Sequence, residues 1–230
     1  MGDLPVLTYF DMEGLGECVR LALVYNDIEF EDRRIKVSDW SPELKATFPF
    51  GQLPVLQVDG HMLSQSLSIL MWAGRHGSGK AFPQDEDTRL RIEQAIYYTE
   101  DFDRAWSPPR YFSLVASRWY GHPEGFAKTS DGEATLKQLR ARFLAERLPE
   151  FMATYSRLIE ESGGFLCTHD EPSIADFRLL PKLRSLMLDG LKFVPADCLA
   201  AFPVISAYVE RLMAIPKLRA WYEQHPDPNN

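Results

Sequence analysis

The sequence has few cysteines, no long apolar run and no dense basic run. Its 230 residues include three cysteines, Cys18, Cys167 and Cys198, which are far apart and form no CxxC or CxxH arrangement. Neither a disulfide framework nor a zinc site is indicated, so we expect no metal and mostly buried, reduced thiols. Because apolar residues nowhere continue for eighteen positions, we expect no membrane-spanning helix.

Positive charge is also scarce. The chain has 25 Lys and Arg against 33 Asp and Glu, which gives a net charge of −8. With no basic cluster to outweigh this background, we expect no nucleic-acid partner. The first residues lack the basic and apolar segments of a secretory signal, so we expect a cytoplasmic protein. The hydrophobic content of 45% is enough for the cores of one large or two small domains.

The first eighty residues mix strand and helix patterns. Residues 5–10 are rich in β-formers, residues 17–25 repeat apolar side chains at helical period, and residues 30–37 alternate like an edge strand. Turn residues between 38 and 50 predict a loop with a short helix. Together these patterns predict a mixed α/β sheet.

One stretch, residues 50–66, combines two further features. It predicts a strand, a tight Asp59-Gly60 hairpin, a second strand and a helix that starts at Gln65-Ser66. A cis bond before Pro54 would turn the Leu53 backbone outward to pair with another main chain, and the helix start would hold an anion. A ligand that binds to both the Leu53 backbone and the helix start would have a peptide bond and an anionic end. Each of these residues, taken singly, is also consistent with a purely structural role.

From Pro83 onward strand signals vanish, and we place a domain boundary there. We expect one or two helices over residues 88–120 with a break at Pro108-Pro109, and a long helix over residues 132–161 interrupted near Pro149. Shorter helices follow at 200–213 and 217–224. Ser173 and Asp176 predict a capping box at the start of another helix.

Several of these motifs resemble those of the glutathione transferases, and the likeness covers nearly the whole chain. It is strongest to the sigma class, which includes prostaglandin D synthases and the lens S-crystallins. The Ser173 box also recurs in this family. The other segments that carry the resemblance are Leu7-Thr8-Tyr9-Phe10, Asp39-Trp40 with Leu44-Lys45, Phe50-Gly51-Gln52-Leu53-Pro54-Val55-Leu56, Val58-Asp59-Gly60 and Gln65-Ser66.

The resemblance implies an α/β plus all-α fold. Residues 1–82 would form a thioredoxin-like, glutathione-binding domain with a mixed sheet. Residues 83–230 would form an all-helical bundle domain that contributes a hydrophobic substrate pocket. The resemblance further implies a homodimer, glutathione as co-substrate and a small hydrophobic electrophile as the second substrate.

The family also assigns roles to residues. By resemblance, the catalytic residue is Tyr9, whose phenol would hydrogen-bond the glutathione sulfur. Lowering a thiol pKa by about two units takes roughly 2.7 kcal/mol, and one charge-assisted hydrogen bond supplies about 1.5–3 kcal/mol. The implied glutathione-binding residues are Trp40 and Lys45 at the glycine end, Gln52 and Leu53 in the middle, Gln65 and Ser66 at the γ-glutamyl carboxylate, and Asp101 of a partner subunit at the α-amino group.

The sequence also departs from the family pattern. Leu15 stands where the sigma class commonly has an Arg that polarises the tyrosine, so we expect weaker thiolate activation. Glu13 would place negative charge near the electrophile, which would disfavour acidic second substrates. We expect Met12, Trp106 and Tyr111 to line the pocket for the second substrate.

Three functions follow from these residues. The first is a transferase that uses Tyr9, or a prostaglandin D isomerase with the same site. The second is a non-catalytic glutathione-binding or crystallin-like structural protein. The third, a thiol-disulfide oxidoreductase, would need a cysteine in residues 11–14, which have none, whereas Cys18 lies inside a predicted helix.

Overall fold

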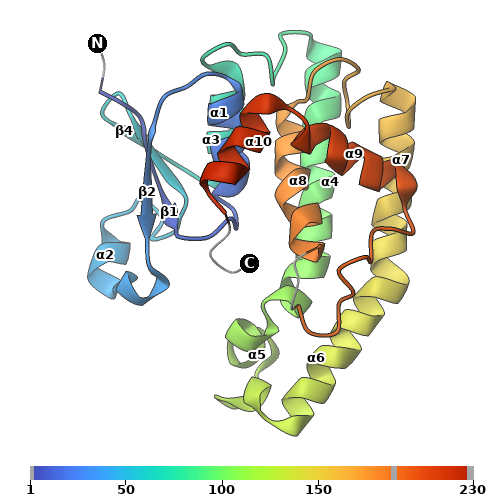
Figure 1. Ribbon diagram of the computed structural model, residues 1–230. Helices are drawn as coiled ribbons and strands as arrows, with labels where there is room; N and C mark the ends of the chain where they lie inside the picture. The colour runs from blue at the N-terminus through green and yellow to red at the C-terminus, as the bar shows by residue number, and fades with distance from the viewer. Residues whose placement is uncertain (1–2, 188–190, 227–230) are drawn as a thin grey trace.

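The computed structural model describes residues 3–187 and 191–226 and shows a small sheet domain beside a taller group of helices (Figure 1). The sheet has the order β2-β1-β3-β4, with β1 parallel to β2 and β3 antiparallel to both β1 and β4. The predicted mixed sheet is confirmed. The elements of this part are β1 (Val6–Phe10), α1 (Glu17–Tyr25), β2 (Glu31–Ile35), a 3-10 turn (Val37–Asp39), α2 (Pro42–Ala46), β3 (Val55–Val58), β4 (His61–Ser64) and α3 (Ser66–Arg75).

The position of each strand follows from its side chains. β1 is buried along its middle and lies inside the sheet, whereas β2, with the sequence EDRRI, keeps charged side chains in water at an edge. The hairpin between β3 and β4 turns at Asp59 and Gly60, whose φ angles of 48° and 75° fit the two-residue turn that this pair predicts.

Beyond the sheet domain, every element is helical in the part of the chain that the structure describes. In Figure 1, α4, α7 and α8 run side by side, and α6 continues into α7. The α/β plus all-α prediction is confirmed. The elements are α4 (Glu86–Arg110), α5 (Phe112–Tyr120), a 3-10 turn (Phe126–Lys128), α6 (Ser130–Arg142), a π-helical turn (Phe143–Arg147), α7 (Leu148–Ser162), α8 (Ile174–Leu186), α9 (Pro203–Met213) and α10 (Pro216–Gln224).

Prolines shape two helix boundaries here. Pro108 and Pro109 lie inside α4, which ends one residue later at Arg110, so the predicted break falls just after the pair. The predicted interruption near Pro149 is confirmed as the π-helical turn that precedes α7. Pro149 itself lies in the first turn of α7, where a missing N–H group removes no helical hydrogen bond.

The capping box before α8 is confirmed. The carboxylate of Asp176 is fully buried and accepts from the N–H of Ser173 at 2.7 Å, the hydroxyl of Ser173 at 2.8 Å, the N–H of Leu166 at 2.9 Å and the hydroxyl of Tyr208 at 2.8 Å. Burial raises the pKa of this carboxyl group. Four donors around one carboxylate fix the start of α8, which is buried over most of its length.

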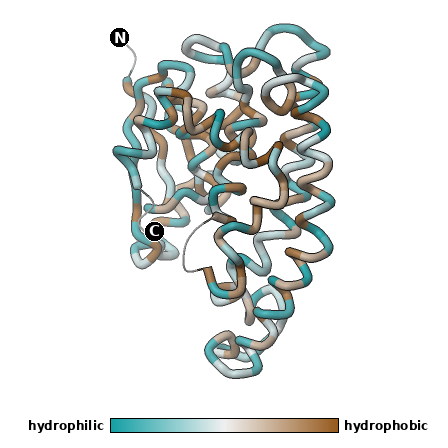
Figure 2. The backbone as a smooth tube through the Cα atoms, turned by 45° about the vertical axis from the view of Figure 1, so that its right-hand side comes forward, coloured by the Kyte–Doolittle hydropathy of each residue, from teal (hydrophilic) through white to brown (hydrophobic). Residues whose placement is uncertain are grey.

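The two parts of the chain are joined through α1, which packs against α3, α8 and α10. Two contacts tie α10 to it: the indole Nε1 of Trp221 donates to Glu17 at 2.8 Å, and Nζ of Lys217 donates to the carbonyl of Tyr25 at 3.0 Å. Hydrophobic segments concentrate in the interior, and the outer turns are mostly hydrophilic (Figure 2). The sheet domain is therefore fixed against the helices.

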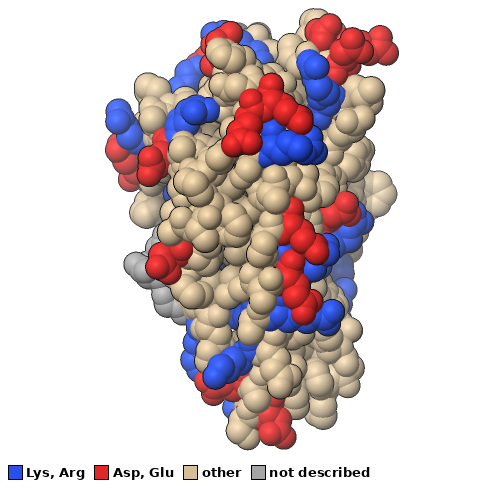
Figure 3. Space-filling model, turned by 90° about the vertical axis from the view of Figure 1, so that its right-hand side faces the viewer, with Lys and Arg blue, Asp and Glu red and all other residues tan. Residues whose placement is uncertain are grey.

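On the face shown in Figure 3, Lys and Arg lie in small groups beside Asp and Glu. Within residues 3–187 and 191–226, no helix is long and apolar enough to cross a membrane.

Candidate functional site

The stretch between α2 and α3 forms one wall of a cavity of about 350 Å³. The bond between Leu53 and Pro54 is cis, and Leu53 precedes the paired part of β3, which begins at Val55. The cavity is lined by Phe10, Leu15, Trp40, Lys45, Gly51, Gln52, Leu53, Pro54, Gln65, Ser66 and Arg118. The structure thus brings together six of the predicted binding residues.

The side chains of this wall are held by local packing. Trp40 packs edge-on against Phe10, with ring centroids 5.5 Å apart. The stem of Lys45 lies over Gly51, where an added Cβ would come within 3.1 Å of Cε of Lys45. Gly51 also has a φ of +56°, so close approach and backbone conformation both favour glycine there.

The start of α3 carries the other end of the wall. Gln65 has a φ of +72°, which is uncommon for a residue other than glycine and is often found at binding sites. This conformation turns the chain from β4 into α3, so that Ser66 opens the helix. The amide Nε2 of Gln65 donates to Oε1 of Gln52 at 3.2 Å. The helix start and both amides therefore face the same cavity, as an anion site requires.

Tyr9 itself is not among the residues that line the cavity, but its chain neighbour Phe10 and its hydrogen-bond partner Leu15 are. Its side chain is buried, and its hydroxyl oxygen accepts a hydrogen bond of 2.9 Å from the N–H of Leu15. Burial, the largest effect, raises the pKa of Tyr9 to about 12, and the Leu15 bond lowers it in part. The phenol is therefore neutral at ordinary pH, and because the N–H group occupies its oxygen as acceptor, its own proton remains available to a thiolate.

Two glycines fix the ring of Tyr9. A Cβ at Gly16 would lie 2.6 Å from ring carbons of Tyr9, and one at Gly14 would lie 2.5 Å from the hydroxyl oxygen. The Glu13-Gly14-Leu15-Gly16 loop therefore covers the ring at a distance that only glycine permits. This close cover positions the phenol against the main chain of Leu15.

Arg20 supplies the positive charge beside this ring. Its guanidinium lies 5.7 Å from the ring centroid of Tyr9 and is fully buried. It donates to the carbonyl of Met12 at 2.8 Å, to Glu17 at 3.1 Å and to Asp32 at 3.0 Å. From the sequence we noted that Leu15 replaces the usual arginine, but we did not predict a role for Arg20. Arg20 lies in a helix among apolar residues, and no motif marks it. Leu15 acts on the phenol through its main chain.

The remaining predicted residues lie elsewhere. Asp101 is exposed on α4, away from the cavity, and pairs with Arg104 at 2.7 Å. Trp106 is buried against Phe143, with ring centroids 4.7 Å apart, so it belongs to the core and the prediction that it lines a pocket is wrong. Tyr111 is half-buried and raises the pKa of Tyr9, which places it near the phenol.

Two charged residues bear on the expected charges of the site. Glu13 pairs with Arg184 at 3.2 Å and its side chain is largely buried, so its charge is balanced; its effect on acidic second substrates stays a prediction. Arg118 of α5 lines the cavity, which no sequence pattern indicated. Met12 contributes its carbonyl to Arg20 and is half-buried.

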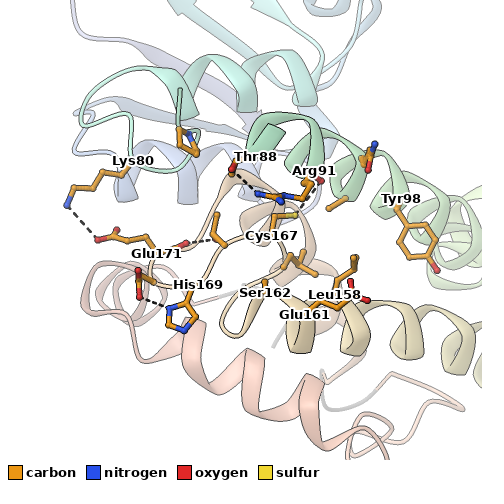
Figure 4. Close-up of a pocket in the computed structure, with 16 residues that line it drawn as sticks. Lys80, Thr88, Arg91, Tyr98, Leu158, Glu161, Ser162, Cys167, His169 and Glu171 are labelled. Carbon is orange, nitrogen blue, oxygen red and sulfur yellow. Dashed lines mark hydrogen bonds and ion pairs between the residues drawn. The ribbon is translucent and has the colours of Figure 1, made fainter. Parts of the chain in front are cut away.

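A second, larger cavity of about 770 Å³ lies between α4, the end of α7 and the loop before α8 (Figure 4). Four of its titratable side chains form two pairs: Lys80 with Glu171 at 3.9 Å and His169 with Asp170 at 2.6 Å. Burial raises the pKa of Cys167 to about 12, which disfavours a thiolate. Among the residues that can be described, no group of three His, Cys, Asp or Glu could hold a metal. The smaller cavity is therefore the candidate site.

Comparison with known proteins identifies the family of this chain. The model "Glutathione S-transferase, N-terminal domain" matches residues 5–75, and "Glutathione S-transferase, C-terminal domain" matches residues 122–225. The chain belongs to the glutathione S-transferase family, a family of glutathione-binding enzymes. The predicted fold, a thioredoxin-like domain followed by a helical domain, is confirmed by the same matches.

Individual relatives are more specific. Glutathione S-transferase 1 of Ascaris suum is 31% identical over 221 residues, 96% of each chain. Hematopoietic prostaglandin D synthase of Homo sapiens is 54% identical over 63 residues, 27% of this chain and 31% of that protein. The solved structure of prostaglandin synthase D of Nilaparvata lugens superposes with a TM-score of 0.77 at 30% identity, covering 98% of this chain and 100% of that one. The predicted likeness to the prostaglandin D synthase branch of the family is confirmed.

Proposed function

We propose that this protein joins the thiol of glutathione to hydrophobic electrophiles, with Tyr9 as the catalytic residue. The observation that carries the proposal is the hydrogen bond from the N–H of Leu15 to the phenol oxygen, next to a cavity that gathers the tripeptide-binding residues. The phenol proton would stabilise the thiolate, which attacks the electrophile while the thiol proton leaves to solvent. One charge-assisted hydrogen bond of about 1.5–3 kcal/mol is enough for this step.

We further propose how the tripeptide is held. Trp40 and Lys45 bind the glycine carboxylate, and Gln52 with the main chain of Leu53 pairs with the cysteinyl segment. Gln65 and Ser66 at the start of α3 bind the γ-glutamyl carboxylate. The six residues support this because they line one cavity. In this proposal residues 1–82 bind glutathione and residues 83–230 form the hydrophobic side.

A homodimer is part of the proposal. Asp101 is exposed on α4 and lies away from the cavity of its own chain, as a residue would that approaches the glutathione α-amino group in a partner subunit. Its neighbour Tyr97 is 57% exposed on the same helix, which is consistent with a surface that a second copy covers. We also place the protein in the cytoplasm, where its three free thiols would remain reduced.

The test is conjugation of glutathione with a chromogenic aryl halide by the wild-type protein and by Tyr9→Phe. We expect kcat/KM to fall about 10- to 100-fold with little change in the unfolding midpoint, because the variant loses one hydrogen bond to the thiolate. Tyr120→Phe, which removes an exposed phenol of α5 that is not among the lining residues of the cavity, is the matched control and should keep full activity. An unchanged rate in Tyr9→Phe would refute the mechanism.

Prostaglandin isomerisation is the second candidate, favoured by the names of the relatives from Homo sapiens and Nilaparvata lugens. It would use the same thiolate, so an endoperoxide assay in the presence of glutathione distinguishes the two activities. Retention on a glutathione column without turnover of any electrophile or endoperoxide would instead favour a non-catalytic binding protein.

A further inference from the structure

Arg118 reaches the candidate site from the side opposite to the sheet domain. Among the described residues that line the cavity, it is the one that comes from the helical domain. It belongs to α5, which lies at the lower end of α4, beside α6 (Figure 1). The cavity therefore has a sheet-domain wall, where glutathione would bind, and a facing side that carries a guanidinium.

The direction of Arg118 follows from how α5 is anchored. Phe112 and Ala116, one helical turn apart, are buried against Leu136 of α6 in a small cluster of their own. A residue two positions beyond Ala116 points about 200° away from it around the helix. The face opposite to this anchor thus holds Arg118 towards the cavity, on a helix that packing fixes in place.

The guanidinium of Arg118 has no partner within the described part of the chain. Among the residues that the structure describes, no hydrogen bond or ion pair involves Arg118, whereas Arg20 and Arg140 each make several. The described residues that line the cavity also include no Asp or Glu. An arginine that faces a cavity and has no carboxylate beside it is available to bind an anion.

Glutathione itself does not need this charge. In the proposed binding mode its two carboxylates meet Lys45 and the start of α3, both on the sheet-domain wall. Glu13 is paired with Arg184 at 3.2 Å and is not among the lining residues of this cavity. The remaining anion in the site would therefore belong to the second substrate.

We propose that Arg118 selects second substrates that carry a carboxylate or a similar anionic group on a hydrophobic body. This inference rests on the proposed function and reverses the expectation, based on Glu13, that acidic substrates are disfavoured. Arg118 acts as a specificity-determining residue: it contacts the distal anion, whereas the reacting carbon lies beside the glutathione sulfur.

The test compares 4-chloro-3,5-dinitrobenzoate with its methyl ester, two electrophiles that share the reacting ring and differ in one charge. In both reactions the glutathione thiolate displaces chloride, so each rate is divided by its uncatalysed rate. We expect Arg118→Ala to lower the ratio of kcat/KM for acid over ester about three- to tenfold, through the KM for the acid. Arg118→Lys should keep most of the ratio. Arg142→Ala, which removes an exposed charge from α6, should leave it unchanged.

Two results would overturn the inference. The first is an acid-to-ester ratio of kcat/KM that Arg118→Ala leaves unchanged. The second is an equal rise in the KM for glutathione with both electrophiles in Arg118→Ala, which would assign Arg118 to binding of the tripeptide. If neither electrophile is turned over, the transferase proposal fails, and calorimetry with S-hexylglutathione and S-(5-carboxypentyl)glutathione decides instead. Tighter binding of the carboxylate form that depends on Arg118 would still support the inference. Equal binding would refute it.

Discussion

Substituting Gly16 by alanine should displace the ring of Tyr9, the proposed catalytic residue, without straining the main chain. Gly16 has φ −76° and ψ −29°, a conformation that alanine adopts freely. Its added Cβ would lie 2.6 Å from ring carbons of Tyr9, whereas ordinary contact begins at 3.4 Å. The ring therefore has to retreat by about 0.8 Å, which would lengthen and misalign its proposed hydrogen bond to the thiolate.

The expected loss follows from that displacement. If the hydrogen bond contributes about 1.5–3 kcal/mol, Gly16→Ala should lower kcat/KM about 10- to 100-fold. Overpacking should also cost about 1–3 kcal/mol in the free energy of unfolding. Steady-state conjugation kinetics and urea denaturation measure the two effects.

A double variant separates ring displacement from general damage. In the Tyr9→Phe background, Gly16→Ala should cause little further loss of kcat/KM, because the hydroxyl is already gone. Gly60→Ala is the control: with a φ of +75° and no atom within 4 Å of the added Cβ, it should cost about 1 kcal/mol of stability and no activity. Wild-type kinetics in Gly16→Ala would refute the view that the Gly14-to-Gly16 loop positions the phenol.

Three other outcomes are expected. In urea titrations, Ser173→Ala should lower the free energy of unfolding by about 0.5–2 kcal/mol. Asp176→Ala should lower it by more, because the loss of this carboxylate leaves four donors without their acceptor. The pKa of Tyr9 is raised to about 12, so its contribution to the free energy of unfolding is fully present below pH 10 and is lost as the pH rises from about 10 to about 12. A difference absorbance titration of the wild-type protein against Tyr9→Phe should show one phenol that ionises late. Ionisation of this phenol near pH 10 would contradict the prediction. Lys45→Ala should raise the KM for glutathione about tenfold in conjugation assays, whereas Lys36→Ala should not.

The parts of the site that sequence predicted are those set by neighbours in the chain. Asp59-Gly60 makes its turn from two residues, and the Ser173 box from four. The wall with Trp40, Lys45 and Gln65 is likewise built from a continuous segment, so a family motif was enough to place these residues around one cavity. The roles that we propose for them remain predictions.

The parts that sequence missed depend on packing between distant segments. Arg20 serves the ring of Tyr9 only because Met12 and Asp32 supply acceptors from other segments. Arg118 lines the cavity only because α5 is anchored on α6. Trp106 follows helical spacing equally well in a core or in a pocket, and its contact with Phe143 decides between them.

The link between Trp221 and Glu17 has a consequence for the order of events during synthesis. The two residues are 204 positions apart, and Glu17 in turn holds Arg20 at 3.1 Å, beside the ring of Tyr9. A nascent chain whose sheet domain has already emerged from the ribosome still lacks the hydrogen bond from Trp221 to Glu17. The surroundings of the phenol are therefore completed only when α10 has left the ribosome, so ribosome-bound chains stalled before Trp221 should be folded in part and catalytically immature.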